Sequence, residues 1–270
     1  MTAILVTGAN GMIGRKLVAA FAEDGHAVTG LDVDPGDDPR VSAADLAEWD
    51  EGWVARLKGV EVVVHLAATA WPSATWAEAT RLNVDLTLNV YQAAAAAGVA
   101  RVVFASTNWV LAGHRFAEGP LRSDTPPAPV NAYGASKLFG ERAGLSFSRS
   151  HGLSVICLRI GAAQMHEGQL PAPDGPQGEW AARMWVSDHD LCEGFRRAVA
   201  APAGLRFALL NLMSDNPGMR WDLAEAEAAT GYRPRDAFAL PPDAPTRDAL
   251  ARSAWEAVEA IDRFRHDAEL

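Results

Sequence analysis

The chain has 270 residues, of which 49% are hydrophobic and 21% are charged, and its formal net charge is −10 at pH 7. This composition is that of a globular protein with enough apolar material for one large core. The acidic balance argues against nucleic acid and anionic membranes as partners, because both require basic surface. No apolar run is long enough to span a bilayer and the start lacks a signal-peptide pattern, so we expect a cytoplasmic protein.

The first predicted elements are a strand, a glycine-rich turn and a helix. Ala3 to Thr7 is apolar, and from Met12 to Glu23 the apolar residues fall on one helical face. Between them lies Gly-Ala-Asn-Gly-Met-Ile-Gly, whose glycines permit close backbone approach while the helix start offers N–H groups to a pyrophosphate. We therefore predict a dinucleotide site that uses Gly8, Asn10, Gly11, Met12, Ile13 and Gly14.

A second strand is predicted from Ala27 to Leu31, and Asp32 follows it directly. A carboxylate at this place accepts hydrogen bonds from the adenosine ribose and repels a 2′-phosphate, which predicts NAD rather than NADP. Asp34 is the alternative for this role. Asp32 is favoured because it lies nearer the end of the strand.

The remaining elements continue the alternation of strands and helices. In chain order they are a strand at Val60–Leu66, a helix at Ala74–Ala97, a strand at Arg101–Ala105, a loop at Leu111–Val130, a helix at Ala132–His151, a strand at Leu153–Arg159, a loop at Gln164–Glu179, a short strand at Arg183–Ser187, a helix at Asp188–Ala200, a strand at Phe207–Leu212 and a charged helix from about Pro245. This order predicts an α/β fold with a Rossmann-type, doubly wound parallel sheet. We expect one domain over 1–270, with 1–160 mainly forming the NAD-binding core and 161–270 mainly forming a small C-terminal substrate lobe and helices.

Tyr133 and Lys137 stand four residues apart on a predicted helix, so both side chains project from one face. A free tyrosine is a poor base at neutral pH, but an adjacent ammonium and a positive nicotinamide ring stabilise its phenolate. The pair is therefore a candidate for proton transfer to or from a substrate. The same spacing is also common on solvated helix surfaces, so the spacing alone does not indicate a catalytic pair.

The pair is also part of a family resemblance. The glycine loop, His65-Leu-Ala-Ala68, Phe104-Ala-Ser-Thr107 and Tyr133-Gly-Ala-Ser-Lys137 resemble, in this order, the extended NAD-dependent epimerase/dehydratase branch of the short-chain dehydrogenases. The resemblance implies a catalytic triad of Thr107, Tyr133 and Lys137, with Ser106 supporting the turn. It also implies contacts from further residues to the cofactor or near the active site: Asp45 and Leu46 beside the adenine, Leu66, Ala67, Ala68, Asn83, Tyr133, Lys137 and Ile160.

Within this branch, the length of the chain and its motifs most resemble the uronate dehydrogenases, which oxidise the anomeric carbon of a free sugar acid. The resemblance implies substrate contacts from Ser106, Thr107, Asn108, Trp109 and Tyr133, and an arginine against the carboxylate. Arg183 is the candidate for that anion clamp, with a surface ion pair as the alternative. Two departures bear on the substrate: Trp109 stands where that subfamily has histidine, and Ala162 replaces a serine.

The expected function is NAD-dependent oxidation of a hydroxyl of a small free sugar or sugar acid. The alternatives are an NAD-dependent sugar epimerase or isomerase, which returns the hydride, and a non-catalytic NAD-binding sensor. We expect no metal site, and Cys157 and Cys192 are expected to be reduced thiols within apolar segments. His65 is expected to be a packed residue, and Trp71, Trp76, Trp180 and Trp185 are expected to pack in the core or a lid. The sequence leaves homo-oligomerisation open.

Overall fold

The computed structural model describes residues 1–166, 168–171 and 178–240. At its centre is a parallel seven-stranded sheet with the strand order β3-β2-β1-β4-β5-β6-β9. Its strands are β1 (Ala3–Thr7), β2 (Ala27–Asp32), β3 (Val41–Ala43), β4 (Val62–His65), β5 (Arg101–Thr107), β6 (Ser154–Ile160) and β9 (Phe207–Leu212). The chain winds outward from β1 to β3 and then returns to β4 beside β1, which confirms the predicted doubly wound topology. Ligands of such sheets bind beyond the carboxyl ends of the strands at this reversal.

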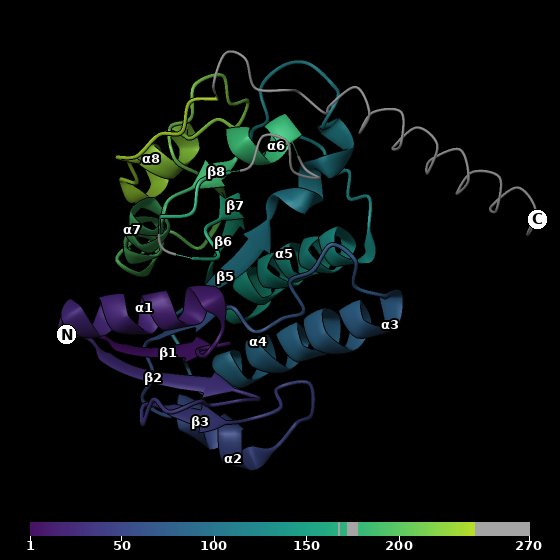
Figure 1. Ribbon diagram of the computed structural model, residues 1–270. Coiled ribbons are helices and arrows are strands. Elements are labelled where there is room, and N and C mark those ends of the chain that lie inside the picture. The colour runs from purple at the N-terminus through teal and green to yellow at the C-terminus, as the bar shows by residue number, and fades with distance from the viewer. Residues whose placement is uncertain (167, 172–177, 241–270) are drawn as a thin grey trace, which may run out of the picture.

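The helices cover the sheet in two layers (Figure 1). Side chains of α1 (Met12–Glu23), α7 (Asp188–Val199) and α8 (Ala224–Thr230) share one apolar cluster with one face of the sheet. A second cluster holds the other face together with α2 (Glu51–Val54), η1 (Ala55–Leu57), α4 (Leu86–Ala96) and α5 (Ala132–His151). Strand alternation produces this division, since Ile4 and Val6 point to the first layer and Leu5 points to the second. None of the helices in the described part of the chain is long and apolar enough to cross a membrane.

A small lobe stands over the carboxyl ends of β5, β6 and β9. We define the lobe as residues 108–131, 161–166, 168–171, 178–187 and 213–223. It contains η3 (Asn108–His114), α6 (Gly178–Arg183) and the short parallel pair of β7 (Ala162–Ala163) and β8 (Trp185–Val186). An isolated bridge joins Leu121 to Trp221. The apolar centre of the lobe is formed by Leu111, Leu121, Trp180, Met184, Met213 and Trp221.

Several predicted elements differ from the observed ones. β3, α2 and α8 were not predicted, and the expected helix at Ala74–Ala97 is divided into α3 (Trp76–Ala79), the π-helical turn η2 (Thr80–Asp85) and α4. The prediction that Arg183 begins a strand is wrong, because it ends α6 and the strand starts at Trp185. The predicted helix from Pro245 and part of the Gln164–Glu179 loop lie outside the described residues.

Candidate active site

The glycine-rich turn connects β1 to α1 at the reversal of the sheet order. Gly8 has a φ of +69°, and a Cβ there would lie 2.7 Å from the backbone nitrogen of Ala67. Only glycine satisfies both the backbone conformation and the close approach of the segment after β4. Gly11 precedes α1 and supplies no side-chain cap, so the first N–H groups of the helix remain available to an anion. The geometry therefore fits a bound pyrophosphate.

Asp32 and Asp34 take different positions at the end of β2. The Asp32 carboxylate accepts hydrogen bonds from the backbone N–H groups of Asn10 (2.9 Å) and Asp34 (3.2 Å), which hold it against the glycine-rich turn. The Asp34 carboxylate instead accepts the N–H of Gly36, 3.1 Å away, within its own turn. Asp32 is thus the carboxylate next to the expected ribose position.

The other residues expected around the cofactor are placed by contacts along the neighbouring elements. Asn83 is buried in η2, accepts the N–H of Thr69 (2.8 Å) and donates to the Ser136 hydroxyl (2.8 Å). Asp45 pairs with Arg81 at 2.6 Å. Leu66 and Ala67 follow β4, and Ile160 ends β6, so these three residues lie at the carboxyl edge of the sheet. Leu46 is buried beside this edge.

His65 is a packed residue, as expected. Its Nδ1 lies 2.7 Å from the Thr7 hydroxyl and its Nε2 lies 3.1 Å from the Thr87 hydroxyl. Burial lowers the pKa of the imidazole to about 3, and the charge of Lys137 acts in the same direction, so the ring stays neutral. The Thr7 hydroxyl also accepts the N–H groups of Leu66 and Ala67 at 3.2 Å, which ties the end of β4 to β1.

Thr107 and Tyr133 meet where β5 ends and α5 begins. The Asn131 side chain caps α5 by accepting the N–H of Gly134 at 2.7 Å, which fixes Tyr133 in the first turn. A Cβ on Gly134 would lie 2.6 Å from the carbonyl oxygen of Trp109, so this glycine lets α5 approach η3. Burial raises the pKa of the Tyr133 phenol, and its hydrogen bond with Thr107 opposes that rise.

Lys137 lies one turn further along the same face of α5. Its ammonium group donates to the carbonyl oxygen of Ala105 at 2.9 Å and lies 4.9 Å from the centre of the Phe104 ring. The side chain is only 3% exposed, and burial lowers its pKa to about 7. Thr107 ends β5, and Tyr133 and Lys137 lie in the first turns of α5, so the three residues form a candidate set for proton transfer.

Ser106 does not join this set, and the expectation that it contacts the substrate is corrected here. Successive strand residues point to opposite faces, so Ser106 turns away from Thr107. Its hydroxyl donates to the Glu141 carboxylate at 2.6 Å. Glu141 is also paired with Arg159, and both side chains are buried. Sequence reasoning did not identify this buried network, which lies directly behind the Thr107–Tyr133 pair.

Asn108 follows Thr107 and has one free polar atom. Its Nδ2 donates to the carbonyl oxygen of Arg159 at 3.1 Å, which fixes the orientation of the amide. Its buried Oδ1 has no hydrogen-bond partner among the described residues. An unpaired buried acceptor is costly and calls for a donor such as a substrate hydroxyl. Trp109 is partly buried, and its backbone N–H donates to the Thr107 hydroxyl at 3.3 Å.

The side chain of Arg183, the proposed anion clamp, is occupied by other groups. Its Nε donates to the Glu179 carboxylate at 2.6 Å, and its Nη1 donates to the carbonyl oxygen of Gly218. These bonds tie α6 to the turn after β9. A role as a carboxylate clamp would require Arg183 to give them up, so the structure favours the ion-pair alternative.

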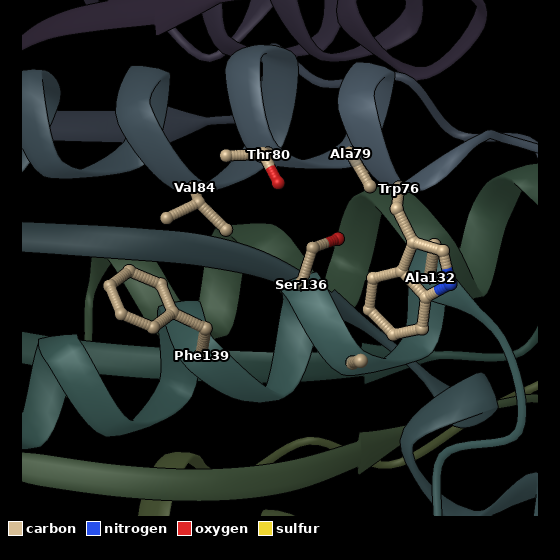
Figure 2. A pocket seen from close by; sticks show the side chains of 8 residues that line it. Trp76, Ala79, Thr80, Val84, Ala132, Ser136 and Phe139 are labelled. Atoms are coloured by element: carbon tan, nitrogen blue, oxygen red, sulfur yellow. The ribbon is translucent and has the colours of Figure 1, made fainter. Parts of the chain in front are cut away.

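The tryptophans divide into two groups. Trp180 and Trp185 are buried in the lobe, as expected, whereas Trp71 and Trp76 are 62% and 68% exposed and are therefore not core residues. Figure 2 shows Trp76 beside a shallow pocket between the α3–η2 segment and α5. This pocket is lined by Trp76, Ala79, Thr80, Val84, Ala132, Ala135, Ser136 and Phe139. Ala132 and Ser136 share a face of α5 adjacent to the face that carries Tyr133 and Lys137.

His189, Asp190 and Asp236 are close enough for their ligand atoms to lie within 4.8 Å of one another. The Asp190 carboxylate is nevertheless fully used within the protein. It accepts the Ser214 hydroxyl at 2.6 Å and the backbone N–H groups of Arg235 and Asp236 at 2.8 and 3.0 Å. These bonds fasten the chain after α8 to the lobe.

The strand order, the glycine-rich turn with Asp32, and the buried Tyr133–Lys137 pair together define a Rossmann-type oxidoreductase. The model of the NAD-dependent epimerase/dehydratase family matches residues 4–174. The chain therefore belongs to the NAD-dependent epimerase/dehydratase family, is an enzyme of the extended short-chain dehydrogenase/reductase type, and uses NAD.

Similar proteins include two from Haloferax volcanii. L-Arabinose 1-dehydrogenase (NAD(P)(+)) is 36% identical over 87% of this chain and 97% of its own length. NAD-dependent glucose-6-phosphate dehydrogenase is 28% identical over 86% of this chain and 93% of its own length. Among solved structures, a uronate dehydrogenase variant from Agrobacterium tumefaciens in complex with NAD has a TM-score of 0.73 at 26% identity, covering 90% of this chain and 92% of its own.

Proposed function

We propose that this protein oxidises the C1 hydroxyl of a free aldose in its ring form, producing a lactone and NADH. The observation that carries the proposal is the burial of Tyr133 and Lys137 on one face of α5, where Lys137 donates to the carbonyl oxygen of Ala105, two residues before Thr107, at the sheet edge that also holds the glycine-rich turn. Relatives named as an L-arabinose 1-dehydrogenase and a uronate dehydrogenase support both the substrate class and the reacting carbon.

In the proposed cofactor site, backbone N–H groups of the glycine-rich turn and the start of α1 bind the pyrophosphate, and Asp32 accepts the ribose hydroxyls. Asp45 and Leu46 lie beside the adenine. Further contacts to the cofactor are expected from Leu66, Ala67, Ala68, Asn83, Tyr133, Lys137 and Ile160. NAD, when bound, supplies the acceptor for the hydride that leaves C1.

The protein's own part in the reaction is to place the substrate and accept its proton. Thr107 orients the C1 hydroxyl, and Tyr133, as phenolate, takes the proton from that oxygen while the C1–H bond breaks and the carbonyl forms. Lys137 lowers the cost of the phenolate because opposite charges on one helix face stabilise each other. Asn108 accepts a hydrogen bond from a second sugar hydroxyl through its free Oδ1.

The test is an aldose labelled with deuterium at C1. The proposal predicts steady formation of reduced cofactor that carries the deuterium, together with a lactone or the sugar acid that forms from it in water. An epimerase would return the deuterium to the sugar with no net reduction of NAD. Binding of NAD without turnover of any aldose would favour the sensor alternative and overturn the proposal.

A further inference from the structure

The charge of the lobe bears on which sugars can bind. Over its described segments the sequence contains four arginines, no lysine and five acidic residues, so acidic side chains outnumber basic ones in the lobe. None of the residues from Gln164 to Ala182, which follow β7 and lead into α6, is a lysine or an arginine. Within the lobe, the four arginines are therefore the cations that could meet an anionic substrate.

Two of these arginines connect segments of the lobe to one another. Arg183 is held by Glu179 and by the carbonyl oxygen of Gly218. Arg220 donates from Nε to the carbonyl oxygen of Gly119 and from Nη1 to that of His114, each at 2.8 Å. In both arginines, N–H groups donate to carbonyl oxygens of another segment, so both side chains join loops of the lobe.

The other two arginines also have partners within the lobe. Arg122 lies 3.4 Å from the Asp222 carboxylate and its side chain is 57% exposed, on the surface of the lobe. The guanidinium of Arg115 lies 5.2 Å from the centre of the Phe116 ring. Outside the lobe but near the site, Arg159 is bound to Glu141 by two hydrogen bonds of 2.8 Å. Arg122 and Arg159 would have to leave these carboxylates to meet an anion.

The interior of the lobe is apolar. Trp180 and Trp221 pack with their ring centres 4.6 Å apart, next to Met184 and Met213. Both indoles are almost fully buried in this cluster, so within the described residues the centre of the lobe presents apolar side chains and no charged group. They cannot replace the hydration of a carboxylate or phosphate, because a desolvated anion needs a cation or several hydrogen-bond donors.

We infer that the site takes uncharged aldoses in preference to uronates and sugar phosphates. This inference rests on the proposed function and names its substrate class. The similar proteins act, by their names, on a neutral pentose, a sugar phosphate and a uronate. The charge of the lobe and the engaged arginines select the first of these chemistries.

A matched series of sugars provides the test. L-Arabinose, D-galactose and D-galacturonate share one ring configuration and differ in the substituent at C5, which is hydrogen, CH₂OH or carboxylate. We expect kcat/KM for the better of the two neutral sugars to exceed that for the uronate at least about tenfold, which corresponds to about 1.4 kcal/mol. The same order is expected for D-glucose over glucose 6-phosphate. Equal or higher values for the charged sugars would overturn the inference.

Two variants, Arg183→Gln and Glu179→Gln, test whether Arg183 binds a substrate carboxylate or only connects α6 to the turn after β9. Arg183→Gln removes the cation, whereas its matched control removes only the ion pair. We expect each variant to change kcat/KM for D-galactose and D-galacturonate by the same factor, with unfolding measured in parallel to detect a damaged lobe. A loss of about tenfold or more confined to the uronate in Arg183→Gln would overturn the inference.

A binding measurement distinguishes failure of this inference from failure of the proposed function. Calorimetry on a Tyr133→Phe variant saturated with NADH should show D-galactose binding more tightly than D-galacturonate. If no sugar is turned over, the proposed oxidation is wrong, but the comparison of D-galactose and D-galacturonate binding still tests the charge preference. Tighter binding of the uronate would overturn the charge preference, whatever the turnover.

Discussion

Glu141 and Arg159 form an ion pair of 2.8 Å in which both side chains are only 1% exposed. Glu141 comes from the middle of α5 and Arg159 from the penultimate position of β6, and the Ser106 hydroxyl of β5 shares the same carboxylate. Arg159 also donates to the carbonyl oxygen of Ser123, 3.1 Å away. The pair thus joins the helix that carries Tyr133 to the two strands that end at the site.

Glu141→Gln should destabilise the fold strongly. The substitution leaves the Arg159 guanidinium buried without its counter-charge, which typically costs about 3–5 kcal/mol. The free energy of unfolding from urea titration measures the effect. The control is Glu193→Gln, which breaks the partly exposed Glu193–Arg197 pair on α7 and should cost less than about 1 kcal/mol. Similar losses for both variants would contradict the structural importance of the buried pair.

Tyr133→Phe should remove most turnover and leave NAD binding nearly unchanged, because the phenol acts on the substrate proton and not on the cofactor's phosphates. The expected fall in kcat is about 10²- to 10⁴-fold. The measurements are NADH formation and NAD binding by calorimetry. Tyr91→Phe is the control, since that buried phenol donates to the carbonyl oxygen of Gly140 away from Thr107. Near-normal turnover in Tyr133→Phe would reject the mechanism.

Lys137→Met should abolish turnover while increasing stability near pH 7. Burial lowers the pKa of Lys137 from 10.5 to about 7, so between these values the unfolded chain binds a proton that the folded protein lacks. The destabilisation of the folded protein by Lys137 is therefore complete below pH 7, and it disappears as the pH rises from about 7 to 10.5. After allowing for the lost hydrogen bond to Ala105, we expect a gain of roughly 2 kcal/mol at pH 7.

The measurement for this variant is urea unfolding at several pH values between 6 and 10. The advantage of Lys137→Met over the unaltered protein should shrink as the pH rises. Lys58→Met, which removes an exposed lysine, controls for the loss of one positive charge. A constant difference across the pH range would show that Lys137 is charged in the folded protein throughout.

Asp32→Ala should shift cofactor preference toward NADP. The backbone N–H groups of Asn10 and Asp34 hold the Asp32 carboxylate at the expected ribose position, where it repels a 2′-phosphate. We expect the ratio of kcat/KM for NADP to that for NAD to rise on the order of tenfold. Asp34→Ala is the comparison, because within the described part of the chain that carboxylate accepts a hydrogen bond only from Gly36 in its own turn. A larger shift in Asp34→Ala would move the assignment.

Much of the sheet could be predicted from the sequence because its buried strands are continuous apolar runs separated by long helices. β3 has only three residues and shows no periodicity, so its pairing with β2 depends on the surrounding fold. The π-helical turn η2 depends on tertiary contacts as well. Asn83 lies within it and bonds to Thr69 and to Ser136 of α5, and no propensity rule anticipates the extra residue in the turn.

Tyr133 and Lys137 could be proposed as a catalytic pair because they are close in sequence, whereas the buried network of Ser106, Glu141 and Arg159 joins residues far apart. One indication was present: Arg159 interrupts an apolar strand, and a charged residue in such a run requires a buried partner. The sequence does not indicate that Glu141 is that partner. For Arg183, Glu179 stands four residues earlier, and this helical spacing favours an ion pair over a strand.

The bridge between Leu121 and Trp221 also has a consequence for the order of folding. Pairing of β1 with β2 and β4 involves segments that follow one another along the chain, whereas the lobe closes only when the regions after β5 and β9 meet. Long-range closure is slow because its entropic cost precedes its stabilising contacts. A refolding chain should therefore recover affinity for NAD before it recovers oxidation of a sugar.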